Sequence, residues 1–572
     1  MYSGIESGST SSMSCKYDAS YVLNGNGFGL PGFTFKGWST DKKGQAMYVD
    51  LSEDNAINLT AERNGKVTLY AVWEVDPYTI GRYVPNNTSI EASYGGNSYT
   101  VYNYINETPQ LSCGGKVVVD WSSCQNDKKT IDYIDAVHPE GGNRFGGGND
   151  NLDIANGITD VYFIGNPNMT YTRVHIFTVN YPANTSLTIH LKNMNFSSYY
   201  ETINSWYDTA VQDVGMNLTI ECIENNSMKS SVASAISNRK NLTITGTGRL
   251  EVKGCDGADA TQPGADGAYG KTAIIADNIT VNMTGSLTII GGDGGNGAAG
   301  DTNYNGGNGG NGAIAIQSNN ITVKNVNTLN IRGGNGGNGG LGGNGAKGTD
   351  TAFSYTSKLT AEHGKNGGNG GNGGNGAGPL QNWKIEILKA KNINLFDGAG
   401  GNGGNGGRGG DGADGANTYE YRGYAAHGGN GGKGGNGGNG GSAADHITFD
   451  NNVVTVAILN GANWQYKNAL NGNGGDGGDG GNGGKGGDGL TYEIAQANPI
   501  GSAATHDPCL VGGNGGNGGD GGAAGTGENY GQSGEGGTGG QGGARGWWCE
   551  FWVFGNKMFP GESGNPGYPN PN

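Results

Sequence analysis

The chain has 572 residues, of which 119 are glycine and only 15 are proline, and its formal net charge is −16. This length exceeds one ordinary hydrophobic core, so we expect several folded regions or an elongated repeat array. The acidic balance argues against nucleic acid and anionic membranes as partners. The sequence also lacks any apolar run of about 18 residues, so no segment is expected to span a membrane.

The cysteines are few for this length, and none is arranged as the C-x-x-C pair of a zinc site. We therefore expect no metal site and no cofactor. Cys113 and Cys124 are spaced so that a disulfide between them would close a short loop. The opening residues, MYSGIESGST, lack a basic patch and an apolar core, so they do not resemble a signal peptide.

Residues 1–14 are expected to be a linker, and a small β-rich module is expected at residues 15–76. Short alternating segments such as KVTLYAVW, separated by turn residues, predict its strands. The frame GW…LYAVW resembles the Listeria–Bacteroides repeat of bacterial surface proteins, which implies a spacer or stalk unit without catalytic residues. Residues 77–114 are then a connecting segment. The matching residues are Pro31, Gly32, Phe35, Gly37, Trp38, Ser39, Gly44, Tyr48, Leu69, Tyr70, Ala71, Val72 and Trp73.

From residue 115 the sequence changes to short β-branched strands with Asn and Gly between them. A unit of two strands joined by a tight turn then recurs, for example as NLTITGTGRLEVKG at 241, NITVNMTGSLTIIGG at 278 and HITFDNNVVTVAILNG at 446. One unit cannot bury its alternating apolar face alone, whereas stacked units bury a continuous column. We therefore predict an all-β fold with a β-solenoid over residues 115–460. Its resemblance to pectate-lyase-like proteins implies a right-handed parallel β-helix.

Glycine-rich tracts between residues 255 and 546 follow these units in pairs, with a short segment that is not glycine-rich inside each pair. This layout predicts hairpin insertions that run out along one tract and back along the next. Collagen needs abundant proline, and repeat-in-toxin calcium coils need a nine-residue period, and neither pattern is present. Two glycines in a period of three fit polyglycine II, a left-handed helix without internal hydrogen bonds.

Bare glycine edges would let such helices approach until the backbone N–H of one meets the C=O of the next. We therefore predict a polyglycine II bundle over residues 255–546, interleaved with the solenoid. The third residue of each repeat is almost always polar, as in Asn335 and Asn338, and is expected to form the outer, solvent-facing layer. A disordered linker is the alternative that composition alone favours.

The tracts resemble those of adhesins at the tips of some phage tail fibres, in which glycine-rich motifs form a polyglycine II sandwich. This resemblance implies that the turns between paired tracts bind a receptor. Snow-flea antifreeze proteins use the same helix type. An ice-binding face, however, needs flat rows of small apolar groups, which Asn, Asp and Lys do not provide.

The turns between paired tracts share aromatic residues, which suit glycan or protein recognition because a rigid ring buries area at low entropic cost. If the hairpins run parallel, these turns gather at one end of the bundle. The alternative is that the rings cap the bundle against water. The predicted ligand-binding residues are Tyr304, Phe353, Tyr355, Tyr419, Tyr421, Tyr424, Tyr492 and Tyr530.

Residues 547–572 form a predicted aromatic cap and tail. Their large side chains would either cap the last solenoid coil or bury against another subunit. The residues concerned are Trp547, Trp548, Phe551, Trp552 and Phe554.

Catalysis has little support in the sequence, because the H-E-x-x-H, G-x-S-x-G and phosphate-loop motifs are absent. Solenoids of this type include polysaccharide lyases and hydrolases, which would use carboxylates on an exposed face. Asp132, Asp135, Asp153 and Asp160 lie in the right region, but solvated turns are the simpler interpretation. We therefore do not expect an enzyme.

Taken together, these features predict an extracellular or cell-surface structural and adhesive protein that binds a surface glycan or protein receptor. The alternative is a self-assembling filament or surface-layer subunit, in which the bundle and the aromatic end pack against other copies. An enzyme acting on polysaccharide is the third hypothesis.

Overall fold

The computed structural model describes, apart from a few single positions, residues 10–42, 58–86, 88–94, 97–103, 115–123, 150–154, 158–172, 174–178, 186–198, 203–204, 217–350, 359–381, 384–415, 427–444, 463–467, 478–482, 547–552 and 555–560. This part of the chain is built from β-strands and extended tracts. Its one helical element is η1 (Ile80–Tyr83), a 3-10 turn. No helix in the described ranges is long and apolar enough to cross a membrane.

The N-terminal module is a two-stranded antiparallel sheet of β1 (Phe33–Ser39) and β2 (Tyr70–Val75). Strand β2 includes the last residues of the predicted strand KVTLYAVW. Trp38 exchanges backbone hydrogen bonds with Tyr48 at 2.9 and 3.1 Å. The Trp38 ring also packs edge-to-face on Phe35, with ring centroids 5.2 Å apart. These contacts give the module a small aromatic core of its own.

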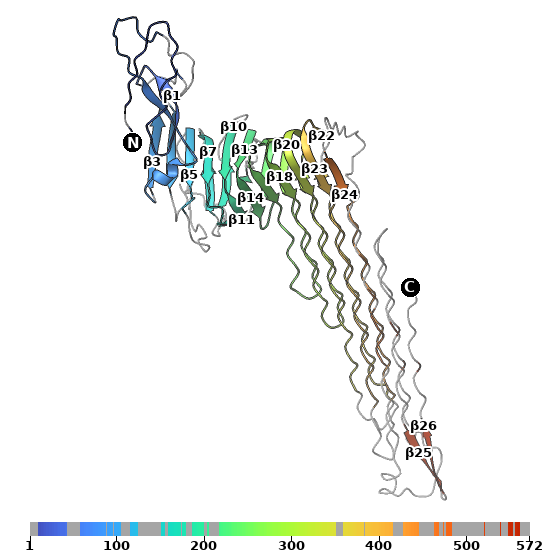
Figure 1. The fold of residues 1–572 in the computed structure, drawn as a ribbon. Helices are drawn as coiled ribbons and strands as arrows, with labels where there is room; N and C mark the ends of the chain where they lie inside the picture. The colour runs from blue at the N-terminus through green and yellow to red at the C-terminus, as the bar shows by residue number, and fades with distance from the viewer. Residues whose placement is uncertain are drawn as a thin grey trace, which may run out of the picture.

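Strands β3 to β24 belong to one large sheet, in which all neighbours are parallel except the β3–β4 pair. The pairings arrange strands that are far apart in sequence side by side in three columns, and Figure 1 labels strands of the first two. The first column consists of β3 (Thr88–Tyr94), β4 (Asn97–Asn103), β5 (Gly115–Asp120), β7 (Ile158–Ile164), β10 (Ser186–Lys192), β13 (Asn217–Ile223), β15 (Ile236–Gly246), β17 (Ile274–Met283), β20 (Asn320–Arg332) and β22 (Lys384–Ile387).

Within the second column, and within the third, neighbouring strands are also parallel. The second consists of β8 (Tyr171–Thr172), β11 (Asn195–Ser198), β14 (Asn225–Ser230), β16 (Arg249–Lys253), β18 (Ser286–Ile290), the second half of β20, β23 (Ala390–Phe396) and β24 (Asn463–Lys467). The third consists of β6 (Asp150–Ile154), β9 (Val174–Thr178), β12 (Ile203–Asn204), the first residues of β15 and β17, β19 (Ile316–Gln317) and β21 (Leu380–Gln381).

Between the columns lies one continuous apolar core. Its residues come from the alternating positions of the repeated unit, and the register stacks equivalent positions on each other. Ile220, Ile244 and Val281 are consecutive members of one such stack, and each is at most 2% exposed. Burying a side chain of this size stabilises the fold by about 1.5–3 kcal/mol.

A second apolar cluster joins the N-terminal part to the large sheet. Ile80 of η1 packs with Val75 and Tyr99 against the outward side chains Val118 and Tyr162 of β5 and β7. Parallel pairing therefore begins with β4, inside the segment 77–114 that the sequence predicts to be a connection. At the other end the sheet extends to β24, just beyond the predicted limit of 460, while the predicted unit at 446 lies outside the described residues.

On the outer face of the first column, asparagine side chains form a ladder from strand to strand. The Nδ2 atom of Asn241 donates to Oδ1 of Asn217 at 2.8 Å, Asn278 donates to Asn241 at 3.0 Å, and Asn320 donates to Asn278 at 2.8 Å. The Asn residues that open the units at 241, 278 and 320 thus hold neighbouring strands in register, together with Asn217 at the start of β13.

Four glycine-rich hairpins are described, and they leave the sheet at equivalent places. Each begins after a second-column strand, and the first three return to a strand of the third column. Figure 1 shows the tracts side by side, extending in one direction from one edge of the sheet. We name them the first (254–272), second (291–314), third (333–378) and fourth (398–444) hairpins, call each half a tract, and call all tracts together the slab.

Candidate functional site

The backbone of the slab is hydrogen-bonded between tracts. In the repeat at 336–338 each N–H group donates to a different tract. The three acceptors, each 2.8 Å away, are the carbonyl oxygens of Ala399 and Gly310 and the Oδ1 atom of Asn296. Because these partners come from the second and fourth hairpins, a tract inside the slab is bonded to neighbours on several sides.

At Gly337 and Gly374 the neighbouring backbone lies closer than a Cβ atom at these positions would allow. A Cβ added to Gly337 would lie 2.0 Å from the carbonyl oxygen of Gly295, and one added to Gly374 would lie 2.0 Å from that of Gly310. Such distances are far below van der Waals contact, and the atoms that would be struck belong to backbone. The prediction that bare glycine edges let the tracts approach each other is therefore consistent with the geometry of the second and third hairpins at these positions.

The asparagines have a structural role that the sequence analysis missed. The N–H of Asn402 donates to Oδ1 of Asn338 at 2.9 Å, and the N–H of Asn338 donates to Oδ1 of Asn296 at 2.8 Å. This series of hydrogen bonds ends at Asp259, whose Oδ1 atom accepts the N–H of Asn296 at 2.6 Å. The Asx side chain of one tract thus satisfies the third N–H of the next tract. The signal was present in the sequence, since the third residue is mostly Asn or Asp and seldom another polar residue.

Tyr304 is the one predicted ligand-binding residue that lies in the described ranges. It closes the turn of the second hairpin, where its N–H donates to the carbonyl oxygen of Asp301 at 2.9 Å. Asn303 adopts a left-handed conformation in this turn, with φ of 68°. The Tyr304 side chain is 69% exposed, although its carbonyl oxygen accepts a bond from Gly343 of the third hairpin at 2.9 Å.

The described turns lie on the same side of the sheet but at different distances from it. The turn of the second hairpin lies against the body of the third, which continues past Gly343 to Thr349 and returns through Glu362. The second hairpin therefore ends nearer to the sheet than the third does (Figure 1). The other predicted binding residues, Phe353, Tyr355, Tyr419, Tyr421, Tyr424, Tyr492 and Tyr530, lie outside the described residues.

The aromatic C-terminal segment forms an antiparallel hairpin of β25 (Trp547–Trp552) and β26 (Gly555–Pro560). Trp547, Trp548, Phe551 and Trp552 belong to β25, while Phe554 lies outside the described residues. Figure 1 shows this hairpin at the far end of the tracts, away from β24. The two predicted roles of this segment, a cap over the last solenoid coil or a contact with another subunit, stay predictions.

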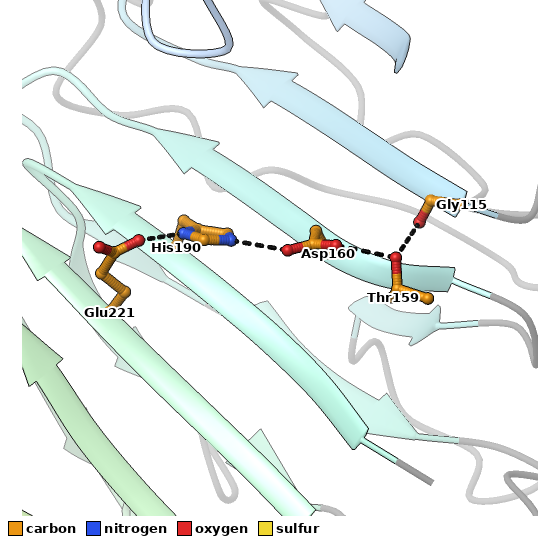
Figure 2. A network of polar contacts seen from close by, with 5 residues as sticks. All are labelled: Gly115, Thr159, Asp160, His190 and Glu221. Atoms are coloured by element: carbon orange, nitrogen blue, oxygen red, sulfur yellow. Dashed lines mark hydrogen bonds and ion pairs between the residues drawn. The ribbon is translucent and has the colours of Figure 1, made fainter. Parts of the chain in front are cut away.

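A polar network crosses four strands at the start of the large sheet (Figure 2). The Nε2 atom of His190 in β10 lies 3.1 Å from Oδ1 of Asp160 in β7, and its Nδ1 atom contacts Oε2 of Glu221 in β13. The Thr159 hydroxyl donates to Oδ2 of Asp160 at 2.8 Å and lies 3.4 Å from the carbonyl oxygen of Gly115.

The charges of this network stabilise one another. With a carboxylate at each ring nitrogen, His190 can donate on both sides only as the imidazolium. Burial disfavours that charge, but the bonds to Asp160 and Glu221 outweigh burial and raise the pKa of His190. The bond from His190 in turn lowers the pKa of Asp160 and that of Glu221. The imidazole also stacks on Tyr162, with ring centroids 3.9 Å apart.

Asp160 is therefore part of a cross-strand ion network and is not a solvated turn residue. The two carboxylates are both held by the same imidazole, an arrangement that fixes the register of three strands. Asp153 lies in β6, while Asp132 and Asp135 lie outside the described residues. Within the described ranges no group of three or more His, Cys, Asp or Glu residues is arranged to hold a metal ion.

No family model matches the chain, and no curated protein matches it. Among solved structures, a springtail antifreeze protein from Granisotoma rainieri, described as a nine polyproline type II helical bundle, is similar at 23% identity. The match covers 38% of this chain and 91% of that protein, with a TM-score of 0.08, which is too low to support an argument about fold or function. The resemblances to the Listeria–Bacteroides repeat and to phage adhesins stay predictions.

Replacing Gly337 by alanine tests the close approach of the tracts. The added methyl would lie 2.0 Å from the carbonyl oxygen of Gly295, so the third hairpin must move away from the second. We expect the amides of 333–345 to lose at least about tenfold of their protection in hydrogen exchange. The control is Leu341→Ala, which shortens a side chain that is 56% exposed. Equal protection in G337A and L341A would contradict the tight packing.

Replacing Asn338 tests the side-chain acceptor. Asn338→Leu removes the oxygen that accepts the N–H of Asn402, whereas Asn338→Asp keeps an oxygen at the same place. Asn338 and Asn402 are both exposed, so the loss corresponds to the net contribution of one hydrogen bond, about 0.5–1.5 kcal/mol. We therefore expect N338L to lower the urea midpoint of the slab and N338D to change it little. A midpoint that is equal in the two variants would show that the acceptor does not stabilise the slab.

We expect the polar network around His190 to stabilise the fold most within a limited range of pH. The raised pKa of His190 means that its contribution is complete below the ordinary value of 6.5 and is lost as pH rises through the raised pKa. The lowered pKa values of Asp160 and Glu221 mean that theirs is complete above the ordinary values of 3.8 and 4.5 and is lost as pH falls through the lowered ones. All three contributions are complete between pH 4.5 and pH 6.5. We expect His190→Gln to be most destabilising in this range, by about 1–3 kcal/mol.

Urea denaturation of the wild type and H190Q across the pH range measures this difference. Glu251→Gln is the control, because Glu251 pairs with Arg249 on the surface with 39% of its side chain exposed. Parallel pH profiles for wild type and H190Q would show that the network does not contribute as described.

Proposed function

We propose that the chain is an extracellular, cell-surface binding protein whose glycine-rich hairpins present their turns to a glycan or protein receptor. In this proposal the three columns of parallel strands are a right-handed β-solenoid, and the slab is a polyglycine II bundle attached to its side. About 98% of the crossover connections between parallel strands of one sheet are right-handed, which supports a right-handed solenoid.

The observation that carries the proposal is the rigid projection of the hairpins. Every described hairpin leaves an equivalent place in the sheet, and the N–H groups of its repeats are bonded to neighbouring hairpins, as at 336–338. A construction of this kind holds loops at a distance from the core without letting them move freely. Loops on a rigid support are where binding residues concentrate in other folds.

The described turn of the second hairpin has the expected composition. Tyr304 exposes 69% of its side chain in a turn whose backbone is fixed by bonds to Asp301 and Gly343. A large ring on an immobile backbone loses little entropy on binding, which makes tyrosine effective in recognition surfaces. The net charge of −16 disfavours polyanionic ligands and so favours uncharged ones such as neutral sugars.

Binding of the labelled wild type to a glycan array and to intact cells tests this function. A variant with Tyr304, Tyr355 and Tyr421 replaced by serine should lose at least about tenfold of its bound signal, because contact tyrosines often contribute more than 1 kcal/mol each. The control replaces Tyr70 and Tyr83, which are 37% and 46% exposed in the N-terminal part.

Hydrogen exchange of the tracts should be the same in both variants, which separates lost contacts from lost structure. Unchanged binding by the turn variant would contradict the assignment of the turns. A wild type that binds neither the array nor cells would contradict the adhesive function itself.

A further inference from the structure

The slab has two layers of tracts and therefore two faces. The first, or outgoing, tracts of the hairpins bond to each other through Asx side chains, as Asn338 does with Asn296, and the second, or return, tracts do so as Asn372 does with Asn308. Glycine N–H groups join the two layers. The third residues of a tract lie on one side of it, about 9 Å apart. We call the face formed by the third residues of the return tracts the return face.

The two faces differ in charge. On the outgoing face the third residues include Asp293, Asp350, Asp411 and Asp414. On the return face the third residues of the second, third and fourth hairpins include no carboxylate within the described ranges, and most of them are asparagine. Bonding inside the slab does not require this, because Oδ1 of Asp350 accepts the N–H of the neighbouring Asp414 at 3.1 Å. What asparagine adds on the return face is an uncharged amide with two N–H donors.

The amides of the return face are held in place with their donors unused. Oδ1 of Asn308 accepts the N–H of Asn372 at 2.9 Å, and Oδ1 of Asn311 accepts the N–H of Asn375 at 2.8 Å. Oδ1 of Asn372 in turn accepts the N–H of Asn439 at 2.9 Å. The Nδ2 atoms of Asn308, Asn311 and Asn372 have no partner among the described residues, and all three residues are exposed. Fixed donors of this kind are ready to bind oxygen acceptors from outside the slab.

An exposed aromatic ring stands beside these amides. Tyr269 is the third residue of its repeat in the first hairpin, at the place where an Asx side chain would accept the N–H of Asn311. That N–H has no acceptor among the described residues, and the Tyr269 side chain is 66% exposed. The slab therefore lacks one hydrogen bond at Tyr269 and carries a ring on its surface instead, which indicates a contact outside the slab.

We propose that the return face around Tyr269 binds a neutral polysaccharide. The ring stacks on the apolar face of a sugar, while the side-chain amides of Asn308, Asn311 and Asn372 donate to its hydroxyl and ring oxygens. Donors that recur about every 9 Å along the tracts suit a polymer whose acceptors also recur. The net charge of −16 disfavours a polyanion. The site lies close to the sheet, shortly before β17 begins at Ile274, and does not depend on the turns.

Affinity electrophoresis of the full chain tests the inference, in native gels that contain mannan, soluble starch or hydroxyethyl cellulose. At least one of these neutral polysaccharides should retard the wild type, and Tyr269→Asp should bind it at least about tenfold more weakly because the ring is lost. The new carboxylate also supplies the missing acceptor, so the amide of Asn311 should gain protection from hydrogen exchange. Weaker binding by a better-bonded slab separates a lost contact from lost structure.

Leu341→Asp is the matched control for Y269D. Leu341 is a third residue of an outgoing tract and is 56% exposed, so L341D adds the same oxygen and the same charge on the opposite face. A second pair compares Asn372→Asp with Asn338→Asp. Both keep the Oδ1 acceptor, but only N372D removes donors from the return face. We expect L341D and N338D to bind like the wild type and N372D to bind at least about threefold more weakly.

Three results would overturn the inference. The first is a wild type that none of the three polysaccharides retards, and the second is equal retardation of Y269D and L341D. The third is retardation by polygalacturonate alone, which would identify a polyanionic ligand. The variant with Tyr304, Tyr355 and Tyr421 replaced by serine separates this site from the turns: it should be retarded like the wild type, and its release would assign the binding to the turns instead.

Discussion

The in-register parallel pairing of the large sheet determines where every glycine-rich tract begins. Neighbouring strands lie about 4.8 Å apart, and equivalent positions of successive units are stacked directly on each other. Hairpins that leave from equivalent places in successive units therefore start side by side. Equivalent positions of their three-residue repeats then lie next to each other. This alignment brings the N–H of Gly336 to 2.8 Å from the carbonyl oxygen of Ala399.

The repeat of three follows from what such a tract must satisfy. Two glycines leave bare edges, so that backbones approach on several sides, and each repeat then has three N–H groups to bond. Two of them reach carbonyl oxygens, while the third reaches an Asx side chain, as Asn402 does on Asn338. Asn and Asp carry their oxygen two bonds beyond Cβ, which is the reach that this geometry requires. An isolated tract would make none of these bonds while still losing about 1–2 kcal/mol of entropy per ordered residue.

The periodic features of this structure could be predicted, and the pairwise ones could not. Alternation in NLTITG identified Leu242 and Ile244 as core residues, and the paired tracts indicated hairpins. The partner of an outward residue depends on register between segments of unequal length. His190 and Glu221 are 31 positions apart, and nothing local in the sequence relates them. Likewise, a polar third residue fits both a solvent layer and a bonded layer, so composition alone did not show that Asn338 accepts a hydrogen bond.

The acceptor role of Asx also separates residues that the slab requires from those that it does not. Leu341 and Tyr269 stand at the third position of their repeats but carry no oxygen that can accept the next N–H. Asn405 and Asn311 are the residues of the next tract whose N–H groups face Leu341 and Tyr269. These two N–H groups have no acceptor among the described residues. Leu341 and Tyr269 are 56% and 66% exposed, so their side chains do not pack the slab either. Internal bonding does not explain the identity of these two residues. Any constraint on them must come from what the faces of the slab contact, as we propose for Tyr304 in its turn.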